Sequence, residues 1–180
     1  AGCGRNNTGK NSSLCADCQT WEKLYGWHLH HRGLYRYNEA MKEYMQRYKF
    51  NGDYRLREVF QREFSKVVNE QEADLIIPIP VTSTTMQTRG FNQVIGLLRE
   101  VPYQSILRTK ISSKVAQSSK TKEERLATKQ PFILDAPEKV INKKVLLVDD
   151  VYTTGRTLYH AANLFKQAGC KEIGSVSLAR

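Results

Sequence analysis

Apolar and polar residues follow two different periods along the chain, and each period predicts its own elements. Short apolar or alternating runs bounded by turn residues predict strands. They lie at residues 33–37, 74–81, 105–109, 131–134, 145–148 and 173–178. Apolar residues at helical spacing predict helices at residues 38–48, 56–67, 91–100 and 157–168. Because strands and helices alternate, we expect an α/β fold with a mainly parallel, twisted sheet flanked by helices.

The chain divides into two regions. Residues 1–27 are turn-rich and hold three of the four cysteines, so we expect them to form a small N-terminal appendage. Residues 28–180 carry the α/β pattern and form the larger domain. Inside this domain, residues 110–130 make a long polar stretch. A loop of that length in a compact domain usually has a functional role or is mobile.

Composition favours a soluble globular protein with an anionic partner. The chain has 180 residues, 40% of them hydrophobic, and a mean hydropathy of −0.55. No run approaches the roughly 20 apolar residues that a membrane-spanning helix needs, and no signal-peptide pattern is visible. The formal net charge of +10 favours nucleotides, nucleic acid or an acidic membrane surface as partners. A basic surface that serves solubility alone is the alternative.

Residues 145–157 form the most informative segment. An apolar run predicts a buried strand, Asp149 and Asp150 follow at its end, and a Thr-Thr-Gly-x-Thr turn opens a helix. Backbone N–H groups and hydroxyls of such a turn converge on an anion, and the positive end of the helix adds attraction. A phosphate beside paired carboxylates indicates a phosphorylated sugar. The segment resembles the fingerprint with which type I phosphoribosyltransferases bind phosphoribosyl pyrophosphate (PRPP). A generic strand–turn–helix with a chance acidic pair is the alternative.

Three cysteines in the first region predict a metal site. Cys15 and Cys18 form a C-x2-C pair, and Cys3 lies upstream among turn residues. This arrangement is typical of part of a zinc ribbon, which needs a fourth ligand to close a tetrahedral site. We therefore expect the chain to begin inside a zinc-binding module. A disulfide is the less favoured alternative, because a nucleotide-binding enzyme suggests a reducing cytoplasm. Three histidines are candidates for the missing ligand: His28, His30 and His31. Their Trp- and Leu-rich setting favours packing or surface roles instead.

Further motifs narrow the resemblance. They are YKFNGD at 48–53, PIP at 78–80 leading to RGFNQ at 89–93, residues 117–125, and SLAR at 177–180. Together with the cysteine-rich region and the 145–157 segment, they resemble the ComF family of competence proteins over essentially the whole chain. The family's upstream cysteines are missing here, so the expected zinc ligand set is incomplete.

The resemblance implies a role for each matching residue. Asp149 and Asp150 would contact the ribose hydroxyls of PRPP, with Mg2+ held largely by ribose and pyrophosphate oxygens. The loop with Arg89 and Gly90 would face the pyrophosphate, which needs a cation and free backbone donors; a plain surface charge is the alternative for Arg89. The 5′-phosphate would be surrounded by Thr153, Thr154, Gly155, Arg156 and Thr157. No residue is identified as the nucleophile or as any other catalytic group.

The resemblance also implies a cellular role. We expect a PRPP-binding, phosphoribosyltransferase-like protein that acts in natural transformation and handles internalised single-stranded DNA, with a competence helicase as a partner. We place it in the cytoplasm, with the inner face of the membrane as a peripheral location. A metabolic transferase acting on a base or small acceptor is the alternative. A third hypothesis is a binding module that uses the nucleotide pocket only for regulation.

The polar stretch is the candidate DNA contact. Residues 108–129 hold seven basic and two acidic residues. A flexible basic segment can follow the backbone of single-stranded DNA while aromatic rings stack on its bases. The lysines of this hypothesis are Lys110, Lys114, Lys120 and Lys122, and the aromatics are Trp21, Tyr25 and Trp27. The alternative is a solvated loop or one that closes over PRPP and excludes water.

Overall fold

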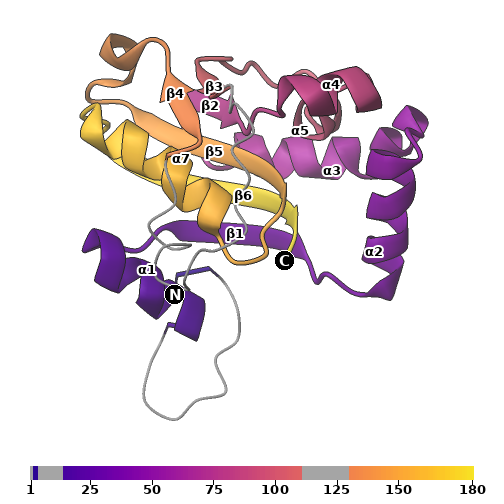
Figure 1. The fold of residues 1–180 in the computed structure, drawn as a ribbon, viewed down its shortest axis with the longest axis horizontal. Helices are drawn as coiled ribbons and strands as arrows, with labels where there is room; N and C mark the ends of the chain where they lie inside the picture. Colours follow the sequence, from indigo (N-terminus) through magenta and orange to yellow (C-terminus); the bar gives the residue numbers. More distant parts are fainter. Residues whose placement is uncertain (1, 4–13, 111–129) are drawn as a thin grey trace.

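A parallel four-stranded sheet forms the centre of the molecule (Figure 1). The computed structural model describes residues 2–3, 14–110 and 130–180. The strands lie in the order β1-β6-β5-β2, and every neighbouring pair in this sheet is parallel. Their bounds are His30–Tyr35 for β1, Leu75–Pro78 for β2, Lys144–Val151 for β5 and Glu172–Ala179 for β6. Because the strands are parallel, the ends of β1, β5 and β6 meet at one edge of the sheet.

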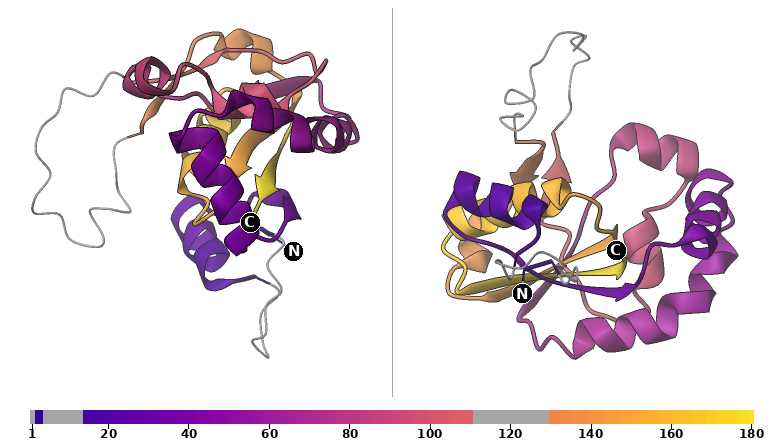
Figure 2. Two further views of the ribbon diagram at one scale, coloured as in Figure 1. Left: turned by 90° about the vertical axis from the view of Figure 1, so that its right-hand side faces the viewer. Right: turned by 90° about the horizontal axis from the view of Figure 1, so that it is seen from below.

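Helices cover both faces of the sheet (Figure 2). Val145 and Leu147 of β5 pack into one apolar core with α1 and α7, whereas Leu146 and Val148 pack into another with α2, α3 and α5. Successive side chains of a strand point to opposite faces, so an unbroken apolar run needs cover on both. The helices are α1 (Ala16–Tyr25), α2 (Glu39–Met45), α3 (Arg57–Asn69), α5 (Gln93–Leu97) and α7 (Arg156–Gln167). The expected α/β class with a parallel, helix-flanked sheet is confirmed.

Short elements connect these layers. A π-helical turn, η1, continues α2, and a two-stranded antiparallel sheet of β3 and β4 stands apart from the main sheet. The described ends of the polar stretch emerge from this hairpin. The bounds are Gln46–Phe50 for η1, Tyr54–Leu56 for η2, Ser83–Arg89 for α4, Leu107–Thr109 for β3, Phe132–Leu134 for β4 and Pro137–Val140 for η3. None of the helices within the described ranges is both long and apolar enough to cross a bilayer.

Two local expectations differ from the structure, and one helix was not expected. The strand expected at 33–37 begins earlier, at His30, because its register with β6 starts there. The helix expected at 91–100 is short, since Leu98 is already extended, and α4 precedes it unexpectedly. Gly90 ends α4 in the left-handed conformation at φ 82°, and Asn92 caps α5 by accepting hydrogen bonds from two backbone N–H groups. Gly90 therefore ends α4 before the expected helix begins, and Asn92 starts α5 as a separate, shorter helix.

Within the N-terminal region, Ala16–Tyr25 form the helix α1 where turns were expected, and this helix shares a core with the larger domain. The Trp21 ring is buried and stacks on the Tyr159 ring at 5.0 Å and 15°. Gly2 also contacts β1: its carbonyl accepts a hydrogen bond from the His31 N–H at 3.0 Å. These contacts bring the cysteines against the sheet. The division after residue 27 and the zinc-binding character of residues 1–27 stay predictions.

Candidate functional site

Asp149 and Asp150 lie in the last residues of β5, at the carboxyl edge of the sheet. The strand runs on to Val151, so the two carboxylates belong to it and do not follow it as expected. Both residues are buried, with 7% and 4% of their surface exposed. The backbone N–H of Asp150 donates to Asp149 Oδ1 at 2.9 Å. The strand thus presents two adjacent acids in a site with little solvent.

Burial disfavours the charged form of the Asp149 carboxyl. It raises the pKa of the Asp149 carboxyl well above its ordinary value, and the neighbouring Asp150 carboxylate raises that pKa further. The Lys49 ammonium acts in the opposite direction and lowers it. Hydroxyl donors or cations that reach the pair would stabilise its charged form. The site is therefore suited to a polyhydroxylated ligand or a metal complex.

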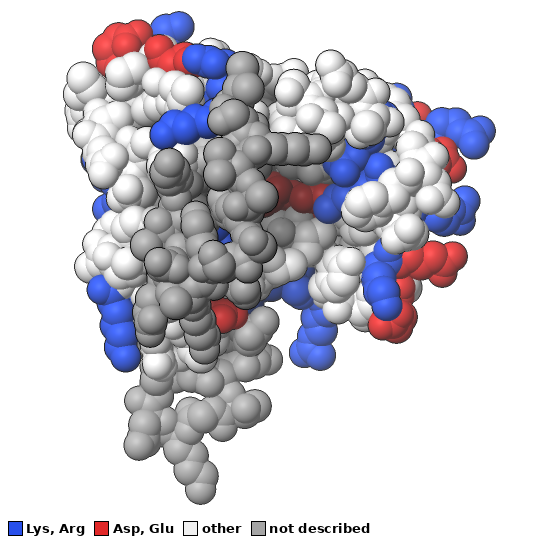
Figure 3. Space-filling model, in the orientation of Figure 1, with Lys and Arg blue, Asp and Glu red and all other residues white. Residues whose placement is uncertain are grey.

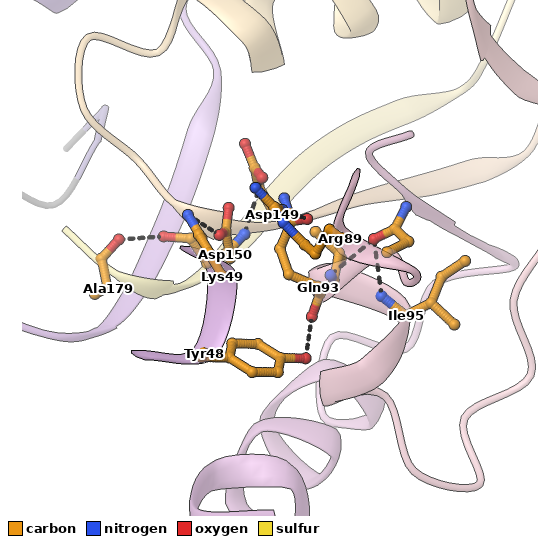
Figure 4. Close-up of polar contacts among 11 residues, drawn as sticks. Tyr48, Lys49, Arg89, Gln93, Ile95, Asp149, Asp150 and Ala179 are labelled. Carbon is orange, nitrogen blue, oxygen red and sulfur yellow. Dashed lines mark hydrogen bonds and ion pairs between the residues drawn. The ribbon is translucent and has the colours of Figure 1, made fainter. Parts of the chain in front are cut away.

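Lys49 is a site residue that the sequence did not single out. Its ammonium forms an ion pair with Asp150 Oδ2, and both side chains are largely buried (Figure 4). Lys49 belongs to the π-helical turn η1, whose wider turn re-aims a side chain and is frequent at functional sites. The motif at 48–53 pointed to this segment, but no sequence periodicity indicates that its lysine reaches β5.

The turn between β5 and α7 has the geometry of an anion-binding turn. The side chains around Gly155 are exposed: Thr153, Thr154, Arg156 and Thr157. Gly155 is buried, caps α7 and has φ 81°; a Cβ there would lie 2.6 Å from Tyr152 Cζ, which excludes any larger residue. The Trp21 indole N–H donates to the Thr154 carbonyl at 2.7 Å and so fixes the turn from α1. Exposed hydroxyls therefore surround the N-terminus of a 12-residue helix.

Arg89 and Gly90 lie at the end of α4, beyond the exit of β2. Asn92 Nδ2 donates to the Ile79 carbonyl at 3.0 Å, which ties this segment to the strand exit. The Arg89 guanidinium donates to Gln93 Oε1 and lies over the exposed Phe50 ring at 5.8 Å. Figure 4 shows Arg89 in the same close-up as the aspartate pair. Figure 3 shows acidic side chains inside a hollow with basic side chains beside them.

The cysteines that were expected to bind metal lie together. The Sγ atoms of Cys3, Cys15 and Cys18 all lie within 4.8 Å of one another, and all three thiols are buried and free of disulfides. Burial raises the pKa of the Cys18 thiol to about 12, a rise that a bound cation would oppose. Three sulfur donors suit Zn2+, which prefers four ligands in a tetrahedron.

The substitute histidines do not complete that cluster among the described residues. His31 is buried and instead holds β6: its Nδ1 lies 2.9 Å from Ser175 Oγ and its Nε2 3.0 Å from Ser177 Oγ. His28 Nδ1 lies 3.4 Å from Glu22 Oε1. The fourth ligand is not provided by the part of the chain that the structure describes.

The DNA hypothesis is only partly covered by the structure. Lys110 is exposed directly after β3. Lys114, Lys120 and Lys122 lie outside the described residues. Trp21 is not an exposed stacking surface as expected, because it packs in the core between α1 and α7. Tyr25 and Trp27 are half-buried and also stack on Tyr159.

Comparisons with known proteins agree with this geometry. A family model described as "Phosphoribosyl transferase domain" matches residues 56–180. Competence protein ComFC of Streptococcus pneumoniae is 38% identical over 169 residues, which cover 94% of this chain and 76% of that protein. The chain belongs to the ComF family of competence proteins. Competence protein ComFC of Bacillus subtilis is 32% identical, covering 93% of this chain and 72% of that protein.

More distant similarities also occur. Competence protein F of Haemophilus influenzae is 27% identical over 92% of this chain and 78% of that protein. A solved structure described as the allosteric regulatory enzyme of purine biosynthesis is 19% identical, with a TM-score of 0.40. That alignment covers 64% of this chain and 25% of the other. The ComF relatives and the matched domain thus place the aspartate pair and the β5–α7 turn inside a phosphoribosyltransferase domain.

Proposed function

We propose that the domain binds PRPP with Mg2+ at the carboxyl edge of the sheet. One observation carries the proposal: buried Asp149 and Asp150 adjoin a glycine-capped helix N-terminus on the same β5–α7 connection. Carboxylates accept hydrogen bonds from ribose hydroxyls, and the helix N-terminus with its hydroxyls suits the 5′-phosphate. Residues 56–180 match the domain family whose chemistry this is.

The pyrophosphate of PRPP would lie beside the cationic side chains of Lys49 and Arg89. Lys49 already contacts Asp150, and Arg89 closes α4 beside Gly90, whose backbone can approach an anion closely. Mg2+ would be held by ribose and pyrophosphate oxygens near the aspartates and would supply charge to the leaving group. Binding of Mg2+–PRPP would draw Lys49 away from Asp150 towards the phosphates. We assign no described residue as a catalytic group, and we name no acceptor for the phosphoribosyl group.

In the cell, we propose a role in natural transformation. The relatives at 38% and 32% identity are named competence proteins, and the net charge of +10 suits a nucleic-acid partner. The protein would handle incoming single-stranded DNA in the cytoplasm or at the inner face of the membrane, together with a competence helicase. The cysteine cluster would hold a structural Zn2+ and so fix α1 against the sheet.

A direct test of this proposal measures PRPP binding. Calorimetry with Mg2+–PRPP should detect binding to the wild type, and the double variant Asp149→Asn with Asp150→Asn should lose at least tenfold in affinity, because hydrogen bonds to charged acceptors contribute about 1.5–3 kcal/mol each. The surface variant Lys42→Gln is a matched control, since Lys42 is exposed and its ammonium pairs with the exposed Glu39. Unchanged affinity in the folded double variant would sink the assignment.

The metabolic alternative is separated by turnover. Pyrophosphate release would be followed with PRPP, Mg2+ and either free bases and small acceptors or single-stranded DNA. Release that depends only on a small acceptor would favour a metabolic transferase. Release or tighter PRPP binding that depends on DNA would favour the competence role.

A further inference from the structure

A cavity of about 1020 Å³ lies between the exit of β1 and the β5–α7 turn. Most of its described lining comes from three parallel strands and the residues that follow them: residues 31–37 of β1 and its exit, residues 151–154 at the end of β5, and Arg180 after β6. Cys3 and Asp17 of the N-terminal region complete it. None of Asp149, Asp150, Lys49 and Arg89 lines it. The cavity therefore borders the proposed PRPP site only through Thr153 and Thr154.

Arg180 supplies an unpaired cation at this cavity. Its Nε, Nη1 and Nη2 atoms are all buried, and none has a hydrogen-bond partner within the described part of the chain. The guanidinium lies over the Tyr152 ring, 4.7 Å from its centroid. A ring face attracts a cation but accepts none of the five N–H donors in the way an oxygen does. A buried, unpaired charge is costly, so an anionic ligand would stabilise this arrangement.

The backbone holds Arg180 in place without a ligand. Its N–H donates to the Tyr35 carbonyl at 2.9 Å, and its carbonyl accepts from the Tyr37 N–H at 2.8 Å. Gly33 permits this approach, because a Cβ at that position would lie 2.9 Å from Arg180 Cβ. The Arg180 backbone is thus fixed beside β1, and its guanidinium rests on the Tyr152 ring, which limits the freedom that a bound anion would have to remove.

The rest of the lining matches a phosphate. Arg36 contributes further positive charge, whereas the Arg32 guanidinium already forms an exposed ion pair with Glu70. Thr153 and Thr154 border the cavity but belong to the proposed 5′-phosphate site. Asp17 is an acidic residue of the lining, and it is already engaged in other interactions. A planar guanidinium fork pairs well with two oxygens of a tetrahedral phosphate. We propose that this cavity is a second phosphate-binding site, separate from the PRPP site, in which Arg180 is the charged contact of a phosphate or phosphate monoester.

Inorganic phosphate is the probe for the test. Wild-type protein and Arg180→Gln would be titrated with phosphate by calorimetry, and Arg180→Gln should lose at least tenfold in affinity. Arg62→Gln is the matched control, because it removes one arginine on α3 that does not line the cavity. Equal phosphate affinity in wild type and Arg180→Gln overturns the proposal.

A second measurement keeps the test decisive if Arg180→Gln does not fold. The side-chain Nε–H resonance of Arg180, assigned by its absence in Arg180→Lys, should shift on addition of phosphate while that of Arg62 stays in place. No shift at Arg180 overturns the proposal.

Separation from the PRPP site is tested by competition. Phosphate should bind with unchanged affinity to protein saturated with Mg2+–PRPP, and exclusion of phosphate by PRPP would make the cavity part of the same site and overturn the proposal. Failure of PRPP to bind would instead contradict the proposed function, and the Arg180 measurements would still decide on the second site.

Discussion

The Lys49 ammonium forms an ion pair with the Asp150 carboxylate, joining the π-helical turn after α2 to the end of β5. The pair is largely buried, and the carboxylate has the raised-pKa Asp149 beside it. Lys49 therefore compensates negative charge that the sheet edge concentrates. A ligand whose hydroxyls or metal ion stabilise the two carboxylates can replace Lys49 there. The Lys49 ammonium is then free to bind the phosphates of that ligand.

The first prediction concerns this ion pair. Lys49→Gln should lower the free energy of unfolding by about 3–5 kcal/mol, because removing one partner of a buried pair leaves an uncompensated charge. Lys42→Gln, which breaks an exposed pair with Glu39, should cost no more than about 0.5 kcal/mol. Urea denaturation at pH 7 measures both. Equal costs would mean that Lys49 does not stabilise the buried acid.

The second prediction concerns the glycine of the β5–α7 turn. Gly155→Ala should lower the free energy of unfolding by about 1–3 kcal/mol more than Gly169→Ala. Both positions have positive φ, but the new methyl meets Tyr152 only at Gly155 and meets nothing within 4 Å at Gly169. Thermal or urea unfolding gives the difference. PRPP affinity should fall with Gly155→Ala and stay constant with Gly169→Ala.

The sheet, α7 and the aspartate pair were predictable from the sequence because their signals are local. The run at 145–148 has both faces buried, and Gly155 marks the only residue type that fits beside Tyr152. The cysteine cluster was predictable for the same reason, since Cys15 and Cys18 sit one helical turn apart.

Contacts between distant segments were not predictable. Lys49 reaches β5 only because a π-helical turn re-aims it, and Trp21 is buried only because α1 packs beside α7. An aromatic residue near a basic surface has the same sequence signature whether it stacks on Tyr159 or on a nucleobase. Arg180 likewise gains its enclosed position from β1 and Gly33, which lie far from it in the sequence.

The third prediction concerns pH. Burial, together with the charge of Arg180, lowers the pKa of His31 from 6.5 to about 3. Below pH 6.5 His31 therefore takes up a proton in the unfolded chain but stays neutral in the native protein. The contribution of neutral His31 to the free energy of unfolding is fully present above that pH. It is lost as the pH falls from about 6.5 towards 3, by at most about 1.4 kcal/mol per pH unit.

Urea denaturation between pH 7 and 4 measures this dependence. His31→Asn should lose stability less steeply than the wild type, whereas His30→Asn, which changes an exposed side chain, should follow the wild type. Parallel curves for wild type and His31→Asn would contradict the buried neutral histidine.

The fourth prediction concerns metal. Metal analysis should find zinc bound at the cluster of Cys3, Cys15 and Cys18, and Cys15→Ser with Cys18→Ser should abolish it. Cys170→Ser is the matched control, because Cys170 is a half-buried thiol outside the cluster. Zinc removal by a chelator should also lower the melting temperature, since metal binding to the native state stabilises it. A native disulfide found by thiol titration would contradict the zinc site.

The last prediction separates DNA binding from PRPP binding. Lys110 is exposed beyond β3, and Lys114, Lys120 and Lys122 follow it in the sequence. Replacing all four lysines with glutamine should weaken single-stranded DNA binding. It should also flatten the plot of log affinity against log salt by roughly 0.7 for each lost phosphate contact.

Fluorescence anisotropy with labelled single-stranded DNA at several salt concentrations measures both quantities. Replacement of Lys139 and Lys143, which lie near η3 away from the β3 end, should change neither. If DNA affinity and slope stay constant while PRPP binding collapses, the polar stretch serves the sugar-phosphate site. Loss of DNA binding with intact PRPP affinity would place the two ligands on separate surfaces, because each would then respond to its own set of charges.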